Sequence, residues 1–202
     1  DVIGVDHVEQ RNYVFPLSFI RDDVVRFLNH RPRETIERDL RDVAFIWASP
    51  PCQGRTAYKR RPGHVRPVGT DGHIALVRKL LRATGIPYVI ENVPGAPLES
   101  PFTLCGSMFG LDVRRHRLFE TSFPATPPAG NHPAQAPRFA PATNRTNLRR
   151  TVEVGVWRIP VETQRQAMGI DWMTLEELSE AIPPAYTEHI GKQLLNALAR
   201  AA

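Results

Sequence analysis

The chain is short of cysteine and has no long apolar run. Cys52 and Cys105 are its two cysteines, and neither lies in a C-x-x-C pair or a His/Cys ligand pattern. This spacing argues against a zinc site and against a disulfide-stabilised secreted fold, so we expect no metal. No stretch approaches the roughly 18 apolar residues that span a bilayer, and no signal-peptide pattern opens the chain. We therefore expect a cytoplasmic protein with no membrane partner.

The composition of the 202 residues is otherwise that of a globular domain with a basic surface. Hydrophobic residues make up 42% and charged residues 23%, which argues against a disordered chain, collagen or a coiled coil. Lys and Arg number 26 against 21 acidic residues, a net charge of +5. This charge favours a polyanionic partner, although a solvated basic surface without a partner has the same composition.

Short apolar runs alternate with helical patterns along the chain. The apolar runs at residues 2–5, 44–48, 88–90 and 117–119 are typical of buried strands. The alternation predicts an α/β fold with a mostly parallel sheet and helices on both faces. Polar or reactive residues follow each strand, at the edge where open α/β sheets bind their ligands.

Helical signals lie on both sides of a Pro-rich stretch at residues 121–158. The first helix carries Ile74, Val77, Leu80 and Leu81 on one face, with Arg78, Lys79 and Arg82 off that face. Later, Thr174 and Glu177 have the spacing of a capping box. A last helix from residue 185 carries an apolar stripe of Ile190, Leu194, Leu195 and Leu198.

The Pro-rich stretch divides the chain into three parts. Its prolines, with Asn, Thr and Arg between them, are typical of a loop or insertion rather than a continuation of the sheet. We expect a core at residues 1–120, a short insertion at 121–158, and C-terminal helices at 159–202 that return to the core.

Three groups with chemical potential follow successive strands. Cys52 directly follows two prolines at a strand end, a rigid and accessible position that suits a nucleophile. Glu91 ends the next strand, where an ordinary acid facing water would also fit. Arg115 and Arg117 alternate, so extended backbone would turn both to one face, although a solvated strand edge has the same pattern. We interpret Cys105 as a buried, inert thiol.

In this order, the motifs resemble those of the cytosine carbon-5 DNA methyltransferase family over essentially the whole chain. The family's P-C-Q is similar to Pro51-Cys52-Gln53, and its E-N-V to Glu91-Asn92-Val93. Its Q-x-R-x-R resembles residues 113–117, with Val113 in place of Gln. Its ninth motif loosely resembles residues 166–170, and its closing G-N-x-V-P-P resembles residues 179–184, with Glu180 in place of Asn. Compact phage and prophage members are the most similar.

The resemblance implies a Rossmann-like fold that binds S-adenosylmethionine and a reaction on a cytosine flipped out of the duplex. Cys52 would add to carbon 6 of the ring, so that carbon 5 can accept the methyl group. Glu91, with a pKa raised by burial, would donate a proton at ring nitrogen 3. Arg115 and Arg117 would hold the carbonyl oxygen. The second product would be S-adenosylhomocysteine.

The resemblance also implies where the cofactor binds. Asp6 would accept hydrogen bonds from the ribose hydroxyls, Asp23 would lie near the adenine amino group, and Pro51 would contact the cofactor. We interpret Asp22 as a helix N-cap. The family's first motif, F-x-G-x-G-G, is missing, and we expect it to precede Asp1, because residues 2–6 resemble the strand that follows that motif.

Double-stranded DNA is the partner that the resemblance implies, with the protein as a monomer. The loop at residues 53–71 and the insertion are rich in groups that contact phosphates and base edges. We expect the contacts from Gln53, Arg55, Lys59, Arg60, Arg61, Arg145, Arg149 and Arg150. The short insertion predicts a brief recognition site, and phage DNA protection and restriction-modification are both compatible roles.

Two alternatives remain. One branch of the family acts on tRNA cytosine. A catalytically inactive DNA-binding relative would explain the missing first motif and the departures at Val113 and Glu180. The presence of Cys52 and Glu91 argues against that reading, because a binding module needs no thiol beside the base.

Overall fold

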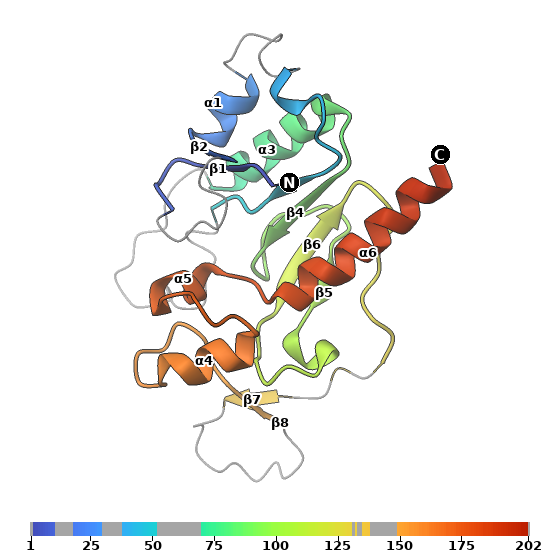
Figure 1. Cartoon of the computed structure of the whole chain (residues 1–202). Helices are drawn as coiled ribbons and strands as arrows, with labels where there is room; N and C mark the ends of the chain where they lie inside the picture. The colour runs from blue at the N-terminus through green and yellow to red at the C-terminus, as the bar shows by residue number, and fades with distance from the viewer. Residues whose placement is uncertain are drawn as a thin grey trace. The chain divides into compact units, whose positions relative to one another are not determined.

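The computed structural model describes residues 2–10, 18–29, 38–51, 70–130, 132, 135–137 and 149–201 (Figure 1). The described residues combine strands and helices, with α1 (Val24–Asn29) and α3 (Thr70–Thr84) between strands of the first half, so the α/β class is confirmed. The chain forms two compact units, residues 1–90 and residues 91–202. Within the described residues, no helix combines the length and apolar character needed to cross a lipid bilayer.

The first unit contains two parallel strand pairs. Strand β1 (Gly4–Asp6) pairs with β2 (Phe19–Arg21), and β3 (Ile46–Ala48) pairs with β4 (Tyr88–Asn92). Helix α1 contacts α3. Helix α3 ends at Gly85, whose φ of +69° is the left-handed conformation that glycine adopts readily.

The apolar face of α3 is largely as its sequence predicts. Ile74, Val77 and Leu81 are buried, and Leu80 is half-buried. The expectation that Arg78 lies off this face is wrong, because Arg78 is buried. Residues 74, 77, 78 and 81 share one helix face at the i, i+3, i+4, i+7 spacing, so the aliphatic part of Arg78 is directed toward the apolar side.

The main sheet is mixed: the expected parallel pairing is present between β3 and β4, and one pairing is antiparallel. Its four strands have the order β3-β4-β6-β5. Strand β5 (Phe102–Leu104), which the apolar runs did not predict, pairs antiparallel with β6 (Arg117–Thr121). The link between them contains the 3₁₀ helix η3 (Gly106–Phe109) and no α-helix. A link without a crossover helix favours antiparallel pairing.

The second unit also contains a small separate sheet. Strands β7 (Gln135–Pro137) and β8 (Arg149–Thr151) pair in parallel and do not join the four-stranded sheet. Beside β8, Val152 forms a bridge with Val113, where backbone N–H of Val152 donates to the carbonyl of Asp112 at 2.8 Å. This contact ties the end of the Pro-rich stretch to the arginine segment at residues 113–117.

Three helices complete the chain: α4 (Val161–Met168), α5 (Leu175–Glu180) and α6 (Pro184–Ala201). The predicted capping box is confirmed at the start of α5. The Thr174 hydroxyl accepts a hydrogen bond from the Glu177 backbone N–H at 3.3 Å, and the Glu177 carboxylate accepts one from the Thr174 N–H at 2.7 Å.

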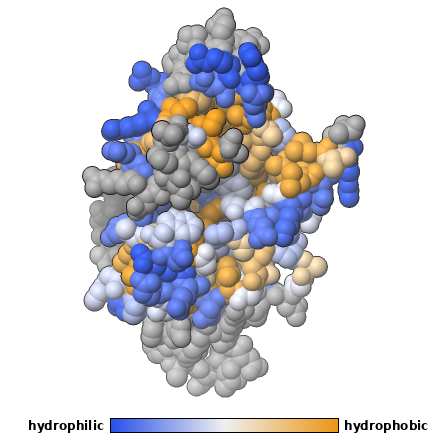
Figure 2. All heavy atoms as spheres, in the orientation of Figure 1, coloured by the Kyte–Doolittle hydropathy of each residue, from blue (hydrophilic) through white to orange (hydrophobic). Residues whose placement is uncertain are grey.

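An apolar core lies between α4, α5 and residues 113 and 152. Its buried members are Val113, Val152, Ile159, Ala167, Met168, Ile170 and Leu178. Helix α6 buries Tyr186, Ile190 and Leu194, which recur every four residues. The predicted stripe is wrong for Leu195, which is 66% exposed, and Leu198 is also exposed. Figure 2 shows apolar atoms on the surface along α6.

Candidate functional site

A buried ion pair joins two of the predicted site residues. Arg117 Nε donates to Glu91 Oε1 at 3.0 Å, and the two side chains are 15% and 9% exposed. Glu91 lies in β4, all of whose residues are buried, and Arg117 begins the neighbouring strand β6. Removing two charges from water is unfavourable unless each has a partner, and here each charge compensates the other.

A second contact fixes the orientation of Arg117. Its Nη1 donates to the backbone carbonyl of His116 at 2.9 Å. The planar guanidinium is therefore held at both Nε and Nη1, which limits its rotation. The two alternatives from sequence, an acid facing water at Glu91 and a solvated edge at Arg117, do not agree with this burial.

Arg115 is also buried, and the C-terminal helices hold it. Its Nη2 donates to the carbonyl of Ser179 at 2.7 Å, and its own carbonyl accepts a hydrogen bond from the Tyr186 hydroxyl at 2.7 Å. Ser179 lies in the last turn of α5, where carbonyls have no partner within the helix. Residues at 179–186 therefore position the arginine segment.

The Tyr186 hydroxyl has a pKa that keeps it protonated, so that it can donate a hydrogen bond to the Arg115 carbonyl. Burial raises the pKa of its hydroxyl well above the usual range, and the nearby charge of Cys105 raises it further. The positive charges of Arg115 and Arg117 lower this pKa, but by less than burial raises it. The hydroxyl thus keeps its proton at neutral pH and can donate to the Arg115 carbonyl throughout.

The two predicted cofactor acids hold local backbone structure. Asp6, which ends β1, accepts from the Val8 N–H at 2.9 Å and from Gln10 Nε2 at 3.0 Å. Asp23 accepts from the N–H groups of Val25 and Arg26 at 2.9 and 3.1 Å.

These contacts make Asp23 the N-cap of α1, so the interpretation of Asp22 as the cap is wrong. The cap side chain must reach the second and third residues of the helix, and because α1 begins at Val24, those residues are Val25 and Arg26. Asp22 instead accepts a hydrogen bond from the Asp23 N–H at 2.9 Å.

The remaining predicted residues are only partly described. Pro51 is exposed after β3, and Arg149 and Arg150 belong to β8. The predicted nucleophile and most of the predicted DNA contacts lie outside the described residues: Cys52, Gln53, Arg55, Lys59, Arg60, Arg61 and Arg145. The described residues therefore bring together Glu91 and Arg117 but do not place Cys52 beside them.

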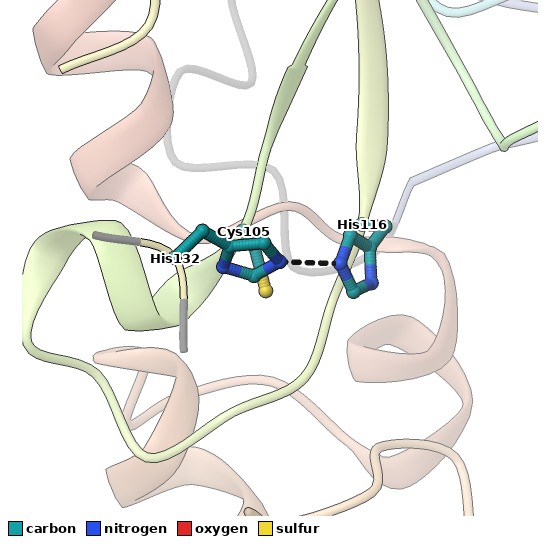
Figure 3. Close-up of side chains that lie close together, drawn as sticks. All are labelled: Cys105, His116 and His132. Carbon is teal, nitrogen blue, oxygen red and sulfur yellow. Dashed lines mark hydrogen bonds between the residues drawn. The ribbon is translucent and has the colours of Figure 1, made fainter. Parts of the chain in front are cut away.

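A Cys/His/His cluster, which the spacing along the chain did not reveal, lies at the ends of β5 and β6 (Figure 3). The Cys105 sulfur and one ring nitrogen each of His116 and His132 all lie within 4.8 Å of one another. The Nε2 atoms of His116 and His132 are 2.9 Å apart, and His132 Nδ1 is 2.8 Å from the Ser107 hydroxyl. Strand β5 would have to be recognised in the sequence, and its pairing with β6 known, for the cluster to be predicted. Leu104 pairs with Arg117, and this register places Cys105 opposite His116.

The cluster changes the chemistry expected of Cys105. Its burial is confirmed, since the residue is 0% exposed. Burial raises the pKa of the thiol. Hydrogen bonds from His116 and the Ser107 backbone, together with the charge of His116, lower it by a larger amount, so the pKa falls from 9.0 to about 6. Burial and the charge of His116 lower the pKa of His132. The thiolate is the reactive and metal-binding form of cysteine, so the lowered pKa favours a more reactive thiol than burial alone predicts.

The described residues of the second unit thus hold a buried carboxylate–guanidinium pair and, separately, a cysteine sulfur close to two imidazoles. The Glu91–Arg117 pair can accept and donate hydrogen bonds side by side, largely shielded from water. The Cys105, His116 and His132 side chains offer the sulfur and nitrogen atoms that bind zinc and copper ions. A scan of protein-family models and a search of curated proteins both found no match to this chain.

Proposed function

We propose that this chain is a DNA cytosine carbon-5 methyltransferase that uses S-adenosylmethionine, as its motifs imply. The observation that carries the proposal is the 3.0 Å contact between Glu91 and Arg117. These are the glutamate of the E-N-V motif and the last arginine of the R-x-R segment, and both are needed at one base in this reaction. The α/β fold, with its parallel pairs β1–β2 and β3–β4, is compatible with a Rossmann-like methyltransferase core.

The Glu91–Arg117 pair matches the Watson–Crick edge of cytosine. That edge presents an amino donor, ring nitrogen 3 and a carbonyl oxygen in a row. The Glu91 carboxyl accepts from the amino group and shares a proton with nitrogen 3, while Arg117 donates to the carbonyl oxygen. Arg115, held by Ser179 and Tyr186, fixes the backbone that presents Arg117. A thymine edge has a proton at nitrogen 3 and no amino group, so it would fit this pair less well.

In the proposed reaction the Cys52 thiolate forms a bond to carbon 6 of the cytosine. The addition places negative charge on the ring; Glu91, protonated from solvent when the base binds, donates that proton to nitrogen 3, and Arg117 donates to the carbonyl oxygen. S-adenosylmethionine, when bound, supplies a sulfonium methyl group that carbon 5 can take. Loss of the carbon-5 proton to solvent then expels the Cys52 thiolate and restores the aromatic ring, leaving a methylated base.

The residues proposed for the cofactor are chemically suitable. Asp6 stands at the carboxyl end of a parallel strand, where ribose hydroxyls find acceptors in such folds, and its side chain is 37% exposed. Each of its oxygens can accept more than one hydrogen bond, so the contacts to Val8 and Gln10 do not exhaust it. Asp23 at the start of α1 and Pro51 after β3 complete the proposed set.

Double-stranded DNA is the proposed partner. The net charge of +5 favours a polyanion, and the basic residues at positions 55–61, 145, 149 and 150 supply phosphate contacts. A tRNA substrate and a catalytically inactive DNA-binding protein are the other outcomes of the test.

The test is transfer of labelled methyl from S-adenosylmethionine to duplex DNA, with tRNA in parallel, using a chain that carries any residues the gene encodes upstream of Asp1. Label in DNA that disappears in Cys52→Ala and falls at least 100-fold in Glu91→Gln supports the proposal. Glu162→Gln, which changes an exposed carboxylate, is the matched control and should leave transfer unchanged. Label in tRNA alone, or in neither substrate from a folded protein, would reject it.

A further inference from the structure

The Cys105, His116 and His132 side chains have the geometry of a metal site that is nearly closed. A tetrahedral Zn²⁺, with Zn–N of about 2.0 Å and Zn–S of about 2.3 Å, holds its ligand atoms about 3.3 to 3.6 Å apart. The ligand atoms of the cluster lie within 4.8 Å of one another, and the two Nε2 atoms are 2.9 Å apart. To admit the ion, the two Nε2 atoms would have to move apart by about 0.4 Å, and the sulfur would have to lie about 3.6 Å from each of them.

Strand pairing positions two of the three ligands. Cys105 directly follows β5 and His116 directly precedes β6, and the antiparallel register places them opposite each other. His132 comes from the connection after β6 and is exposed, whereas Cys105 is fully buried. Figure 3 shows the sulfur beside the two rings, with both Nε2 atoms facing each other. The sheet thus fixes Cys105 and His116, and the connection after β6 brings His132 beside them.

Ser107 provides the outer contact that metal-binding histidines usually have. Its hydroxyl lies 2.8 Å from His132 Nδ1, which leaves Nε2 of the same ring directed at His116. In metal sites, such a partner on the second ring nitrogen fixes both the orientation and the tautomer of the ligand. A pair of exposed histidines that met by chance would not require this support.

From these contacts we propose that Cys105, His116 and His132 bind a Zn²⁺ ion, with water in the fourth position. Zinc takes thiolate and imidazole ligands together in tetrahedral geometry, and its catalytic sites combine three protein ligands with a water. On binding, any proton on the thiol passes to solvent, and the proton between the two Nε2 atoms passes to solvent or to Nδ1 of its own ring, so that a thiolate and two neutral imidazoles form three metal bonds. This proposal departs from the expectation of no metal, which rested on chain spacing and so took no account of strand register.

The site would have a structural effect on the arginine segment. His116 lies between Arg115 and Arg117, so an ion bound to it fixes the backbone on which both arginines stand. It also ties residue 132 to the ends of β5 and β6. Binding to the folded chain alone stabilises that chain, so added Zn²⁺ should raise its unfolding temperature.

The test is a Zn²⁺ titration of the chelator-treated chain against a chromophoric competitor, with Co²⁺ as the spectroscopic probe. We expect one ion per chain, a thiolate-to-cobalt charge-transfer band and the intense visible bands of a tetrahedral ion. His132→Ala should weaken binding more than about 100-fold, and Ser107→Ala by about 10- to 100-fold. His73→Ala and Cys52→Ser are the matched controls and should bind as the unchanged chain does.

Circular dichroism of each variant separates loss of the site from loss of the fold. Cys105→Ser removes a buried group, so if it fails to fold, His132→Ala and Cys52→Ser decide the result. The proposal is overturned if the unchanged chain holds no stoichiometric Zn²⁺, if His132→Ala binds equally well, or if Cys52→Ser abolishes the charge-transfer band. None of these readouts depends on methyl transfer, so this proposal and the proposed function fail separately.

Discussion

The Tyr186 hydroxyl donates a hydrogen bond of 2.7 Å to the backbone carbonyl of Arg115, across 71 residues of chain. Tyr186 is fully buried in α6, where its ring packs against Phe109 and Phe119. Ser179 holds the guanidinium of the same arginine. The C-terminal helices therefore do more than cover the sheet, because they set the position of the segment that carries both candidate catalytic arginines.

Tyr186→Phe tests this contact. The substitution keeps the ring but leaves the buried Arg115 carbonyl without its donor, so we expect a loss of about 1–3 kcal/mol in the free energy of unfolding. Urea denaturation measures it. Tyr88→Phe is the matched control, because the Tyr88 hydroxyl accepts a long bond of 3.3 Å from Nε of Arg82, an exposed residue, and not a short bond from a buried group. Equal losses in the two variants would contradict the account.

The raised pKa of Tyr186 predicts a pH dependence. The unfolded tyrosine loses its proton above about pH 10, while the folded one keeps it, so the folded state binds more protons and stability falls as the pH rises. Relative to Tyr186→Phe, the unchanged chain should lose up to about 1.4 kcal/mol per pH unit above pH 10. The measurement is the unfolding free energy of both chains from pH 8 to 11. Parallel curves would show that Tyr186 titrates normally.

The Glu91–Arg117 pair predicts strong energetic coupling. Glu91→Gln or Arg117→Leu alone leaves the other group buried without its counter-charge, and each should lower the free energy of unfolding by about 3 kcal/mol. The double variant should lose much less than the sum of the two. A double-mutant cycle on the exposed pair Glu188 and Lys192, 2.6 Å apart, is the control and should show a smaller coupling. Additive losses at Glu91 and Arg117 would mean that the contact is not formed.

Gln164 predicts a further stability effect away from the candidate site. It lies in α4 and is fully buried. Its Oε1 accepts a hydrogen bond from the Gly155 N–H at 2.7 Å, and its Nε2 donates to the carbonyls of Val156 and Ile159. Gln164→Leu is similar in volume but leaves three backbone groups, one buried and two part-buried, without this partner, so a loss of about 2 kcal/mol is expected. Gln166→Leu on the same helix is the control. A neutral Gln164→Leu would show that water replaces the side chain.

Local signals in the sequence predicted local structure well. The Thr174–Glu177 spacing specified a capping box because both hydrogen bonds lie within four residues of chain. The apolar periodicity of α3 identified its buried face, but it misplaced Arg78, since a charged head group obscures the aliphatic stem beneath it. The cap of α1 was misplaced by one residue, because Asp22 and Asp23 are equally good capping types.

Contacts between distant segments could not be predicted in the same way. The Cys105–His116 proximity depends on the register of β5 with β6, and β5 is a three-residue strand with a weak sequence signal. The Arg115 contacts with Ser179 and Tyr186 depend on where α5 and α6 pack. By contrast, the motif order indicated Glu91 and Arg117 as partners at one site, and the structure brings these two together.

Whether the Cys52 thiolate attacks the base is tested by covalent capture with duplex DNA that contains 5-fluorocytosine, in the presence of S-adenosylmethionine. Fluorine at carbon 5 cannot leave as a proton does, so the final elimination stops and the enzyme stays bonded to the base. The account predicts a stable protein–DNA adduct that maps to Cys52 and is absent in Cys52→Ala. A folded chain that forms no adduct, or one whose adduct maps to Cys105, would contradict it.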